Sequence, residues 1–504
     1  MTKASHTTSY QIIDRSQLTD YPHDLVVSFC VDCACAVVSQ SLPAAPTPPV
    51  YMPEKYFGLA PELRLEAVDA GHWAVFNPTG NHGIVVVDDD AARLLNRFER
   101  PVTPQEVLND LDCNEEAQQA VGRLQALDLL QSSDIKLPRQ EWQNRPQLLT
   151  AWLHITNACN LGCVYCYVDK NHEHMSVDMG KTAVNAIVRS ALAGGYPAIR
   201  LKYAGGEASL QLETVFMVHD YAVEQCQAAG LGLQAVLLTN GVTLGDLMVL
   251  GLKEREIEVM VSLDSLDGEL GGNRPFLGGQ SSSKRTLQGI HRLLIQDISP
   301  HITITVTDHN SPGIAKVVRY CLAHELKFSL NFYRDNAVAA MGADVQFTDD
   351  RIIAGMEAAF QAIEENLPPW SIVGAILDRG QLVEPHEQAC GAARDYIAID
   401  HYGRVAKCHM EFEQPVGDIS ATNLLPMIQS SPIGVQNPSS QEKEGCRDCE
   451  WRFYCAGGCP LVTHWATGRY DIKSPNCGIY KAIFPIAVRL EGLRLLKYGQ
   501  ALLV

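Results

Sequence analysis

The sequence lacks the features that would place the protein in or across a membrane. It contains no run of the roughly 20 apolar residues that a membrane-spanning helix needs. Its N-terminal stretch, "MTKASHTTSYQIIDRSQLTD", has no apolar core of the kind that defines a secretory signal. We therefore expect a protein without membrane contact that stays in the cytoplasm.

An excess of positive charge is also missing. The chain carries 40 Lys and Arg against 58 Asp and Glu, which gives a formal net charge of −18. Proteins that bind nucleic acids normally present a basic face to the phosphates, so we expect no nucleic-acid partner. The 504 residues, 46% of them hydrophobic, are enough for several domains with a sizeable core. This composition fits an enzyme that acts on a small molecule or a peptide.

Cysteine, in contrast, is abundant, with 16 residues. Disulfides are rare in the reducing cytosol, so ligation of metals or clusters is the better explanation for so many thiols. Most of them fall into groups, and the first group has a C-x2-C-x-C spacing with no further ligands nearby, which is weak evidence for a metal. That group is Cys30, Cys33 and Cys35. Three others stand alone and are predicted to be small buried hydrophobic residues: Cys113, Cys226 and Cys321.

The N-terminal part of the chain predicts a small module after a weakly structured segment. Residues 1–50 end in the proline-rich stretch "LPAAPTPPVYMP", which is typical of a linker. The runs "HWAVF" and "GIVVV" flank "NPTGNH" and predict a β-hairpin. Short helices follow, one of them with a capping box formed by Thr103 and Glu106. Hairpin and helices suggest a winged-helix-like α+β domain over residues 51–135; the alternative is a domain with a packing role only.

Strands and helices alternate regularly over residues 145–345. This alternation predicts an α/β fold with a parallel sheet, either open or curled into a partial barrel, whose ligands bind at the carboxyl ends of the strands. The strands are expected at residues 148–156, 199–203, 233–239, 257–263, 301–306 and 328–333. The remaining chain is expected to form a helical linker (346–389), a cysteine-rich domain (390–480) and an amphipathic packing helix (481–504).

Three cysteines follow the first predicted strand directly, in the stretch "NACNLGCVYC". Cys159, Cys163 and Cys166 are spaced C-x3-C-x2-C. Zinc sites and four-iron clusters usually have four protein ligands. Three thiolates leave one iron of a four-iron cluster without a protein ligand, and an open coordination position is typical of a reactive site. A zinc site or another structural site is the alternative.

This spacing after the first strand of a partial (β/α)6 barrel resembles the radical S-adenosylmethionine (SAM) family. The resemblance implies that the amino and carboxylate groups of SAM chelate the open iron. It also implies that one electron from the cluster cleaves SAM to a 5′-deoxyadenosyl radical, which abstracts a hydrogen atom from the substrate. A flavodoxin- or ferredoxin-type protein is implied as the electron donor.

Later strand ends carry the same resemblance. "AGGEAS" follows the second strand and matches the family's Gly-Gly-Glu motif, with alanine in place of the usual next proline. "LLTNG", "VSLDS" and "LNFYRDN" end the third, fourth and sixth strands. The residues that contact SAM by this resemblance are Tyr165, Gly205, Gly206, Glu207, Asn240, Ser262, Asp264 and Arg334. No general base is singled out, because acidic and tyrosine side chains near the strand ends are too numerous.

A second cysteine pattern lies between residues 390 and 477. It reads C-x12-G-x4-C around Gly403 and then C-x2-C-x5-C-x3-C, with one further cysteine. Paired cysteines are also typical of a zinc ribbon, which is the alternative. The full set resembles the SPASM domain, a C-terminal extension of radical SAM enzymes that mostly modify peptides and proteins. The resemblance implies one auxiliary [4Fe–4S] cluster on Cys390, Cys408 and Cys459, and another on Cys446, Cys449, Cys455 and Cys477.

The first of these auxiliary sets again has only three cysteines. Glu384, His386, Glu387 or the substrate are candidates for the fourth ligand, while His409 is interpreted as structural. Together with the SAM-binding cluster, the expected cofactors are three [4Fe–4S] clusters and SAM.

The leading hypothesis is a maturase that oxidatively cross-links a ribosomally made precursor peptide. An auxiliary cluster would accept the second electron of the oxidation, and the winged-helix-like domain would capture a leader peptide by adding a strand to its sheet edge. Three alternatives stay open. They are a peptide epimerase, an oxidase of protein side chains similar to sulfatase maturases, and an iron–sulfur scaffold or electron carrier without catalysis.

Overall fold

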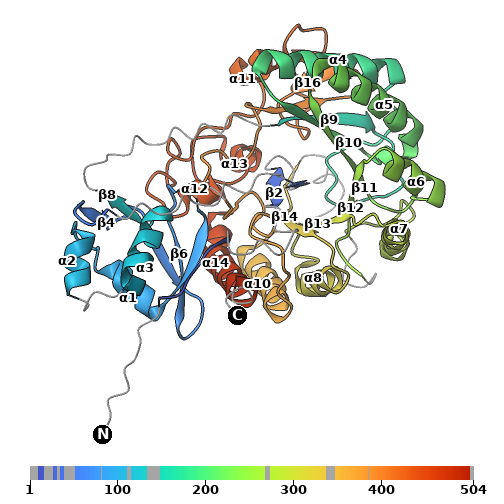
Figure 1. Ribbon diagram of the computed structural model, residues 1–504. Helices are drawn as coiled ribbons and strands as arrows, with labels where there is room; N and C mark the ends of the chain where they lie inside the picture. Colours follow the sequence, from blue (N-terminus) through green and yellow to red (C-terminus); the bar gives the residue numbers. More distant parts are fainter. Residues whose placement is uncertain are drawn as a thin grey trace.

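The computed structural model describes most of the chain between Tyr10 and Gly499 (Figure 1). Within the described ranges, no helix combines the length and the apolarity of a membrane span. Cys33, Cys113 and Glu384 lie outside these ranges. The described residues are 10–15, 27–30, 35–38, 52–80, 82–110, 115–132, 148–266, 273–336, 347–383 and 385–499.

A nine-stranded sheet forms the centre of the protein (Figure 1). Six strands run parallel in the order β14-β13-β12-β11-β10-β9, and helices connect them. This arrangement confirms the predicted α/β class and partial barrel. The parallel strands are β9 (Leu149–Thr156), β10 (Ala198–Gly205), β11 (Gly232–Thr239), β12 (Glu258–Ser262), β13 (His301–Val306) and β14 (Phe328–Phe332). The connecting helices are α4 (Val177–Gly194), α5 (Leu212–Ala229), α6 (Asp246–Glu254), α7 (Ser283–Ile295) and α8 (Ile314–Ala323).

Burial on both faces explains why these strands read as apolar runs in the sequence. All eight residues of β9 are buried, as expected for a parallel strand covered on both sides. The helices have clear ends: Ser176 caps α4 by accepting the Met179 N–H, and Gly195 ends it with a φ of 69°. The six predicted strands agree with the observed ones to within two residues at each end.

The cysteine-rich segment contributes three strands to the same sheet, which the sequence does not predict. β15 (Tyr396–Ile399) pairs parallel with β9, and β16 (Arg404–Ala406) and β17 (Gly417–Asp418) continue the sheet antiparallel. Gly403 lies in the β15–β16 turn with a φ of +82°, and a Cβ there would lie 2.8 Å from Met179 Sδ. Glycine is therefore required at this turn. The segment is continuous with the barrel sheet.

An α+β module precedes the barrel, as the hairpin and helix patterns predict. Its sheet has the order β1-β7-β6-β5 and its helices share an apolar core with one face of that sheet. The capping box is confirmed, because Thr103 Oγ1 accepts the Glu106 N–H at 3.2 Å and Glu106 Oε2 accepts the Thr103 N–H at 3.0 Å. The elements are β4 (Phe57–Leu59), β5 (Arg64–Ala67), β6 (His72–Phe76), β7 (Ile84–Asp88), α1 (Asp89–Asn96), α2 (Pro104–Asn109), α3 (Glu115–Ala126) and β8 (Leu130–Ser132).

Part of the N-terminal segment belongs to this module. β1 (Ile12–Ile13) pairs antiparallel with β7 and covers that edge of the sheet. Ile12 is 5% exposed and Ile13 is fully buried. The prediction of a weakly structured segment is wrong for this piece, because two isoleucines bury their side chains there. A separate hairpin, in which Cys30 and Cys35 are register partners, is formed by β2 (Val27–Cys30) and β3 (Cys35–Val38).

The C-terminal helix α14 (Cys477–Gly499) lies between the N-terminal module and the helix α10 (Asp349–Glu365) (Figure 1). Its predicted packing role is confirmed, but the prediction of an amphipathic helix is wrong, because buried residues cover most of its circumference. Even Glu491 and Arg494 are fully buried, and they are paired with Arg494 Nε donating to Glu491 Oε2 at 2.9 Å. The other helices of this part are α11 (Leu424–Ser430), α12 (Arg452–Cys455) and α13 (Pro460–Thr467).

Two of the isolated cysteines lie in the main hydrophobic core, as predicted. Cys226 is 2% exposed and Cys321 is fully buried. Burial raises the pKa of Cys226 to about 11 and also raises the pKa of Cys321. Both therefore act as small protonated hydrophobic residues.

Candidate active site

The three-cysteine loop leaves the C-terminal end of β9. Cys159, Cys163 and Cys166 are all half-buried. Two backbone hydrogen bonds, of 2.7 and 3.0 Å, tie residues 162–164 to residues 273–275. The loop therefore lies at the end of the sheet where parallel α/β proteins bind their ligands.

The environment of these thiols suits a cluster. Burial raises the pKa of the Cys159 thiol and raises that of Cys163 to about 11. The thiolate, which is the form that ligates metals, is therefore unfavourable here without a positive partner. Iron ions would supply that positive charge. The three thiols fit a four-iron cluster with one iron left open.

Gly205 and Gly206 allow the end of β10 to touch the chain that leads into the cysteine loop. A Cβ at Gly205 would lie 2.3 Å from the Thr156 carbonyl oxygen, and a Cβ at Gly206 would lie 2.4 Å from that of Ala158. The Gly206 N–H also donates to Thr156 O at 2.6 Å. Any side chain at either position would displace the backbone just before Cys159. Their predicted contact with SAM stays a prediction.

Glu207 joins the ends of β10 and β11. Its Oε1 accepts hydrogen bonds from Ser209 Oγ and Thr239 Oγ1, both at 2.6 Å, and its Oε2 accepts the Asn240 N–H at 2.7 Å. A carboxylate offers about four lone-pair sites, so Oε2 retains capacity for the ammonium group predicted to bind there. Asn240 Nδ2 donates in turn to Asn160 Oδ1 at 2.7 Å, beside the first cysteine of the loop.

Tyr165 and Asp264, two predicted SAM contacts, are bonded to each other. The Tyr165 hydroxyl donates to Asp264 Oδ2 at 2.6 Å and accepts a hydrogen bond from Arg274. Burial raises the pKa of Asp264, and the Arg274 guanidinium opposes that rise. Arg274 also acts electrostatically on Cys163, and its buried Nε has no hydrogen-bond partner within the described ranges. Sequence reasoning missed this arginine, because "NRPF" matches no motif.

The remaining two predicted SAM contacts lie at the ends of β12 and β14. Ser262 is half-buried at the last position of β12. Arg334 donates to Asp378 Oδ1 at 2.9 Å, and Asp378 Oδ2 accepts the Tyr480 hydroxyl at 2.8 Å. Arg334 therefore has its carboxylate partner within the protein and connects the barrel to α14. Its contact with SAM stays a prediction.

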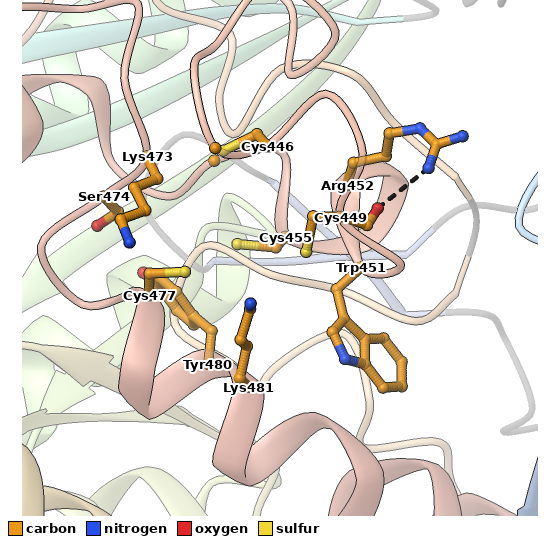
Figure 2. Close-up of a pocket in the computed structure, with 12 residues that line it drawn as sticks. Cys446, Cys449, Trp451, Arg452, Cys455, Lys473, Ser474, Cys477, Tyr480 and Lys481 are labelled. Carbon is orange, nitrogen blue, oxygen red and sulfur yellow. Dashed lines mark hydrogen bonds between the residues drawn. The ribbon is translucent and has the colours of Figure 1, made fainter.

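Four cysteines of the C-terminal segment line a single hollow, and Figure 2 shows their side chains around a common space. One of them ends α12 and another begins α14, so the hollow joins two helices and the loops between them. Burial raises the pKa of Cys446 to about 11, and iron would again offset the cost of the thiolates. The four are those predicted for the second auxiliary cluster: Cys446, Cys449, Cys455 and Cys477.

The three cysteines of the other auxiliary set also lie together. Cys390, Cys408 and Cys459 share one small apolar cluster with neighbours such as Leu461. Burial raises the pKa of Cys408. Asn437 Nδ2 donates to the Cys390 carbonyl at 2.7 Å and lies 3.7 Å from its sulfur. This donor set fits a cluster held through three thiolates.

The fourth ligand of this set stays unassigned. The Glu387 carboxylate accepts hydrogen bonds from Ser439 Oγ at 2.8 Å and from Gln441 Nε2, which turns it toward residues 439–441. His386 is buried, and its backbone N–H donates to Phe453 O at 2.7 Å. None of these three hydrogen bonds is made to a cysteine.

A cavity of about 830 Å³ lies between the barrel and the C-terminal segment. Its size is within the range of roughly 300–1,000 Å³ that is typical of ligand pockets. Much of its wall is formed by residues that follow the predicted cluster ligands Cys166, Cys408 and Cys459. These residues are Tyr167, Val168, Asp169, His409, Met410, Glu411, Phe412, Glu413, Gln414, Val462, Trp465 and Ala466.

Two histidines on the cavity wall each have a ring nitrogen with no hydrogen-bond partner among the described residues. His154 is 2% exposed, with Nε2 bonded to Asn157 Oδ1 at 2.7 Å and a buried Nδ1 without a partner. Burial lowers the pKa of His154 to about 4, so its imidazole is neutral at pH 7. The His401 ring lies 6.0 Å away, its Nε2 is 3.3 Å from Glu173, and its Nδ1 is likewise buried without a partner. His154 Nδ1 is thus a buried proton acceptor beside the cavity.

His409, the residue after Cys408, packs against side chains of β9 and β15. Its ring stacks on Trp152 with centroids 4.1 Å apart, and Nδ1 lies 2.7 Å from the Tyr396 hydroxyl. Burial lowers the pKa of His409 well below its ordinary value. These contacts agree with its interpretation as structural, although the residue also lines the cavity.

Comparisons with known proteins agree with this site. Residues 153–314 match the radical SAM superfamily. An uncharacterized protein of Methanocaldococcus jannaschii is 32% identical over 182 residues, which are 36% of this chain and 60% of that protein, so this chain spans less than two thirds of that relative. The Fe-coproporphyrin III synthase of Methanosarcina barkeri is 26% identical over 333 residues, which are 65% of this chain and 73% of that protein.

The fold is also similar to that of a solved structure, native anSMEcpe with bound AdoMet and Cp18Cys peptide. The TM-score is 0.55 at 17% identity, and the match covers 70% of this chain and 99% of the other. Residues 153–314 therefore resemble a radical SAM domain. Such a domain implies one [4Fe–4S] cluster that binds SAM, and the loop of Cys159, Cys163 and Cys166 has the matching pattern.

Proposed function

We propose that this protein is a radical SAM maturase that oxidises a peptide, most simply by forming a cross-link within it. One observation carries the proposal: a single large cavity is walled both by the residues after Cys166 and by the residues after Cys408 and Cys459. A substrate in that cavity would lie between the proposed SAM site and the proposed first auxiliary site. This is the arrangement that a two-step oxidation needs.

The bound cofactors supply a radical that removes one hydrogen atom and an acceptor for the second electron. The chain's own residues then have to remove a proton. His154 suits this role, because it lines the cavity and its neutral imidazole has a buried Nδ1 with no hydrogen-bond partner among the described residues. A new bond between the radical carbon and a nucleophile of the same peptide completes a net loss of two hydrogens.

The charge of the cavity wall favours a peptide with neutral or basic side chains. Five carboxylates line the cavity, and Arg404 is the arginine among its lining residues. Arg404 is already paired with Asp400 at 2.6 Å. The peptide bound to anSMEcpe, which has a similar fold, supports a peptide as the substrate. The lining carboxylates are Asp169, Asp335, Asp400, Glu411 and Glu413.

The N-terminal module constrains how a leader peptide would bind. Strand addition needs an unpaired sheet edge. The β7 edge of the module is already covered by Ile12 and Ile13, and β5 is the strand at the other edge. A leader would therefore add to β5, or else displace two buried isoleucines.

A co-incubation experiment tests the proposal. The protein is reconstituted anaerobically with iron and sulfide and incubated with SAM, dithionite and the peptides encoded by small reading frames beside its gene. The expected product is 5′-deoxyadenosine together with a peptide lighter by two hydrogen atoms. Deoxyadenosine with unchanged peptide mass, or with deuterium uptake from solvent, would contradict cross-linking and favour epimerisation.

A variant pair tests the proton acceptor. His154→Gln should still form 5′-deoxyadenosine but should release about 10²- to 10⁴-fold less modified peptide, the usual contribution of a general base. His324→Gln is the matched control, because His324 is exposed at the end of α8. Equal peptide modification by both variants would remove His154 from the mechanism.

A second candidate function rests on the relative from Methanosarcina barkeri, whose name assigns it an iron porphyrin product. The cavity is large enough for a macrocycle, but its carboxylates disfavour a ligand that itself carries carboxylate side chains. Conversion of an iron porphyrin, with no change in any peptide, would establish this second candidate.

A further inference from the structure

A buried lysine lies between the two auxiliary cysteine sets. Lys443 is 1% exposed, and its ammonium donates to the Ala456 carbonyl at 3.0 Å. Ala456 belongs to the short link "CAGGC", which runs from Cys455 of the second set to Cys459 of the first. The lysine is therefore anchored on the piece of chain that joins the two sets.

The link is shaped to accept this side chain. Gly457 has a φ of +78°, and a Cβ there would lie 2.6 Å from Lys443 Cδ and 2.8 Å from its Nζ. The ammonium thus packs directly over Gly457, which itself lines the hollow of the second set. A glycine is needed both for the backbone conformation and for the approach of the lysine.

The ammonium has no carboxylate partner in the described part of the chain. Burying a charge is costly unless an opposite charge is near. Burial lowers the pKa of Lys443, and the negative groups that oppose this shift are cysteines of both sets, namely Cys446, Cys455, Cys390 and Cys459. Thiolate-ligated clusters carry net negative charge, so the two clusters together would provide the counter-charge that the protein itself does not.

We propose that Lys443 is a shared electrostatic partner of both auxiliary clusters and raises the reduction potential of each. This inference rests on the proposed function, because it needs both auxiliary clusters to be present. A fixed positive charge favours the reduced, more negative state of a nearby cluster, and a low-dielectric interior strengthens the effect. One residue would thus keep both clusters ready to accept the electron that leaves the substrate.

The test is a potentiometric titration of the reconstituted protein followed by electron paramagnetic resonance. In Lys443→Met, both auxiliary midpoint potentials should move to more negative values. The ratio of reduced to oxidised cluster at a fixed potential should fall at least tenfold, which for one electron corresponds to about 59 mV. The potential of the SAM-binding cluster should stay close to that of the wild type.

Lys473→Met is the matched control. Lys473 also lines the hollow of the second set, but its side chain is exposed to solvent, which screens its charge. Its loss should leave the potential of the first auxiliary cluster unchanged. Unchanged auxiliary potentials in Lys443→Met, or shifts no larger than those in Lys473→Met, would overturn the inference.

Two further measurements keep the outcome clear. If Lys443→Met does not retain its clusters, Lys443→Arg keeps the charge and should have potentials near those of the wild type; a strong negative shift in that variant would overturn the inference. The iron content of the wild type distinguishes a failure of this inference from a failure of the proposed function. About one four-iron cluster per chain would refute the proposed function, whereas three clusters with unshifted potentials would refute only the role of Lys443.

Discussion

Substitution of Gly206 by alanine tests how the end of β10 positions the cysteine loop. A Cβ at this position would lie 2.4 Å from the Ala158 carbonyl oxygen and 2.6 Å from that of Asn157. Weak carbon–oxygen contacts are normally about 3.3–3.6 Å long, so the backbone before Cys159 has to move by about 1 Å. A displacement of that size at a reacting centre costs about 100-fold in rate. We expect Gly206→Ala to form 5′-deoxyadenosine about 100-fold more slowly than the wild type.

The assay is the initial rate of 5′-deoxyadenosine formation, measured beside iron content and thermal unfolding. Overpacking should also lower the free energy of unfolding by about 1–3 kcal/mol. Gly245→Ala is the matched control, because Gly245 lies in the same barrel with a φ of −100° and has no atom within 4 Å of its Cβ position. A rate for Gly206→Ala within about twofold of that control would refute the reasoning, since the rate loss expected from a misplaced reacting centre would then be absent.

Two further predictions concern the second auxiliary set and the buried ion pair of α14. Cys446→Ala should lower the iron content by about four atoms per chain, the content of one cubane cluster, as measured by iron analysis after reconstitution; an unchanged iron content would show that Cys446 holds no cluster. Glu491→Gln should lower the free energy of unfolding at pH 7 by about 3–5 kcal/mol, because the buried Arg494 loses the carboxylate that balances its charge. Burial alone would raise the pKa of Glu491, but Arg494 and Arg15 outweigh it and hold that pKa at about 2. The stabilisation is therefore complete above pH 4.5 and is lost as the pH falls toward 2. Urea titrations should show that the difference in free energy of unfolding between the wild type and Glu491→Gln becomes smaller over that range. A difference that does not change with pH would show that the ion pair does not stabilise the protein.

The sequence predicts those parts of the molecule that local patterns determine. The strands of the barrel are recognisable because each is an apolar run followed by a helix, and the cysteine sets are recognisable by spacing alone. The capping box of Thr103 and Glu106 is similarly local, since the two residues are three positions apart.

Features that depend on distant partners are not predictable in this way. β15 joins β9 across about 240 residues of chain, and no periodicity within either strand identifies the other as its partner. α14 appears amphipathic in the sequence, but the N-terminal module and α10 cover both of its sides and bury even Arg494. The cavity is formed only when the C-terminal segment meets the barrel, so His154 and His401 carry no signal before that contact is known.

The proposed function depends on three cysteines that leave one iron open and on the cleavage of SAM at that iron. Its most direct test is to measure 5′-deoxyadenosine from SAM under anaerobic, reducing conditions with the wild type and with Cys163→Ala, each assayed for iron. We expect 5′-deoxyadenosine from the wild type and none above background from Cys163→Ala, while that variant retains the iron of its auxiliary clusters. Formation at an equal rate by both proteins, or no formation by a wild type that holds its iron, would refute SAM cleavage at this cysteine loop.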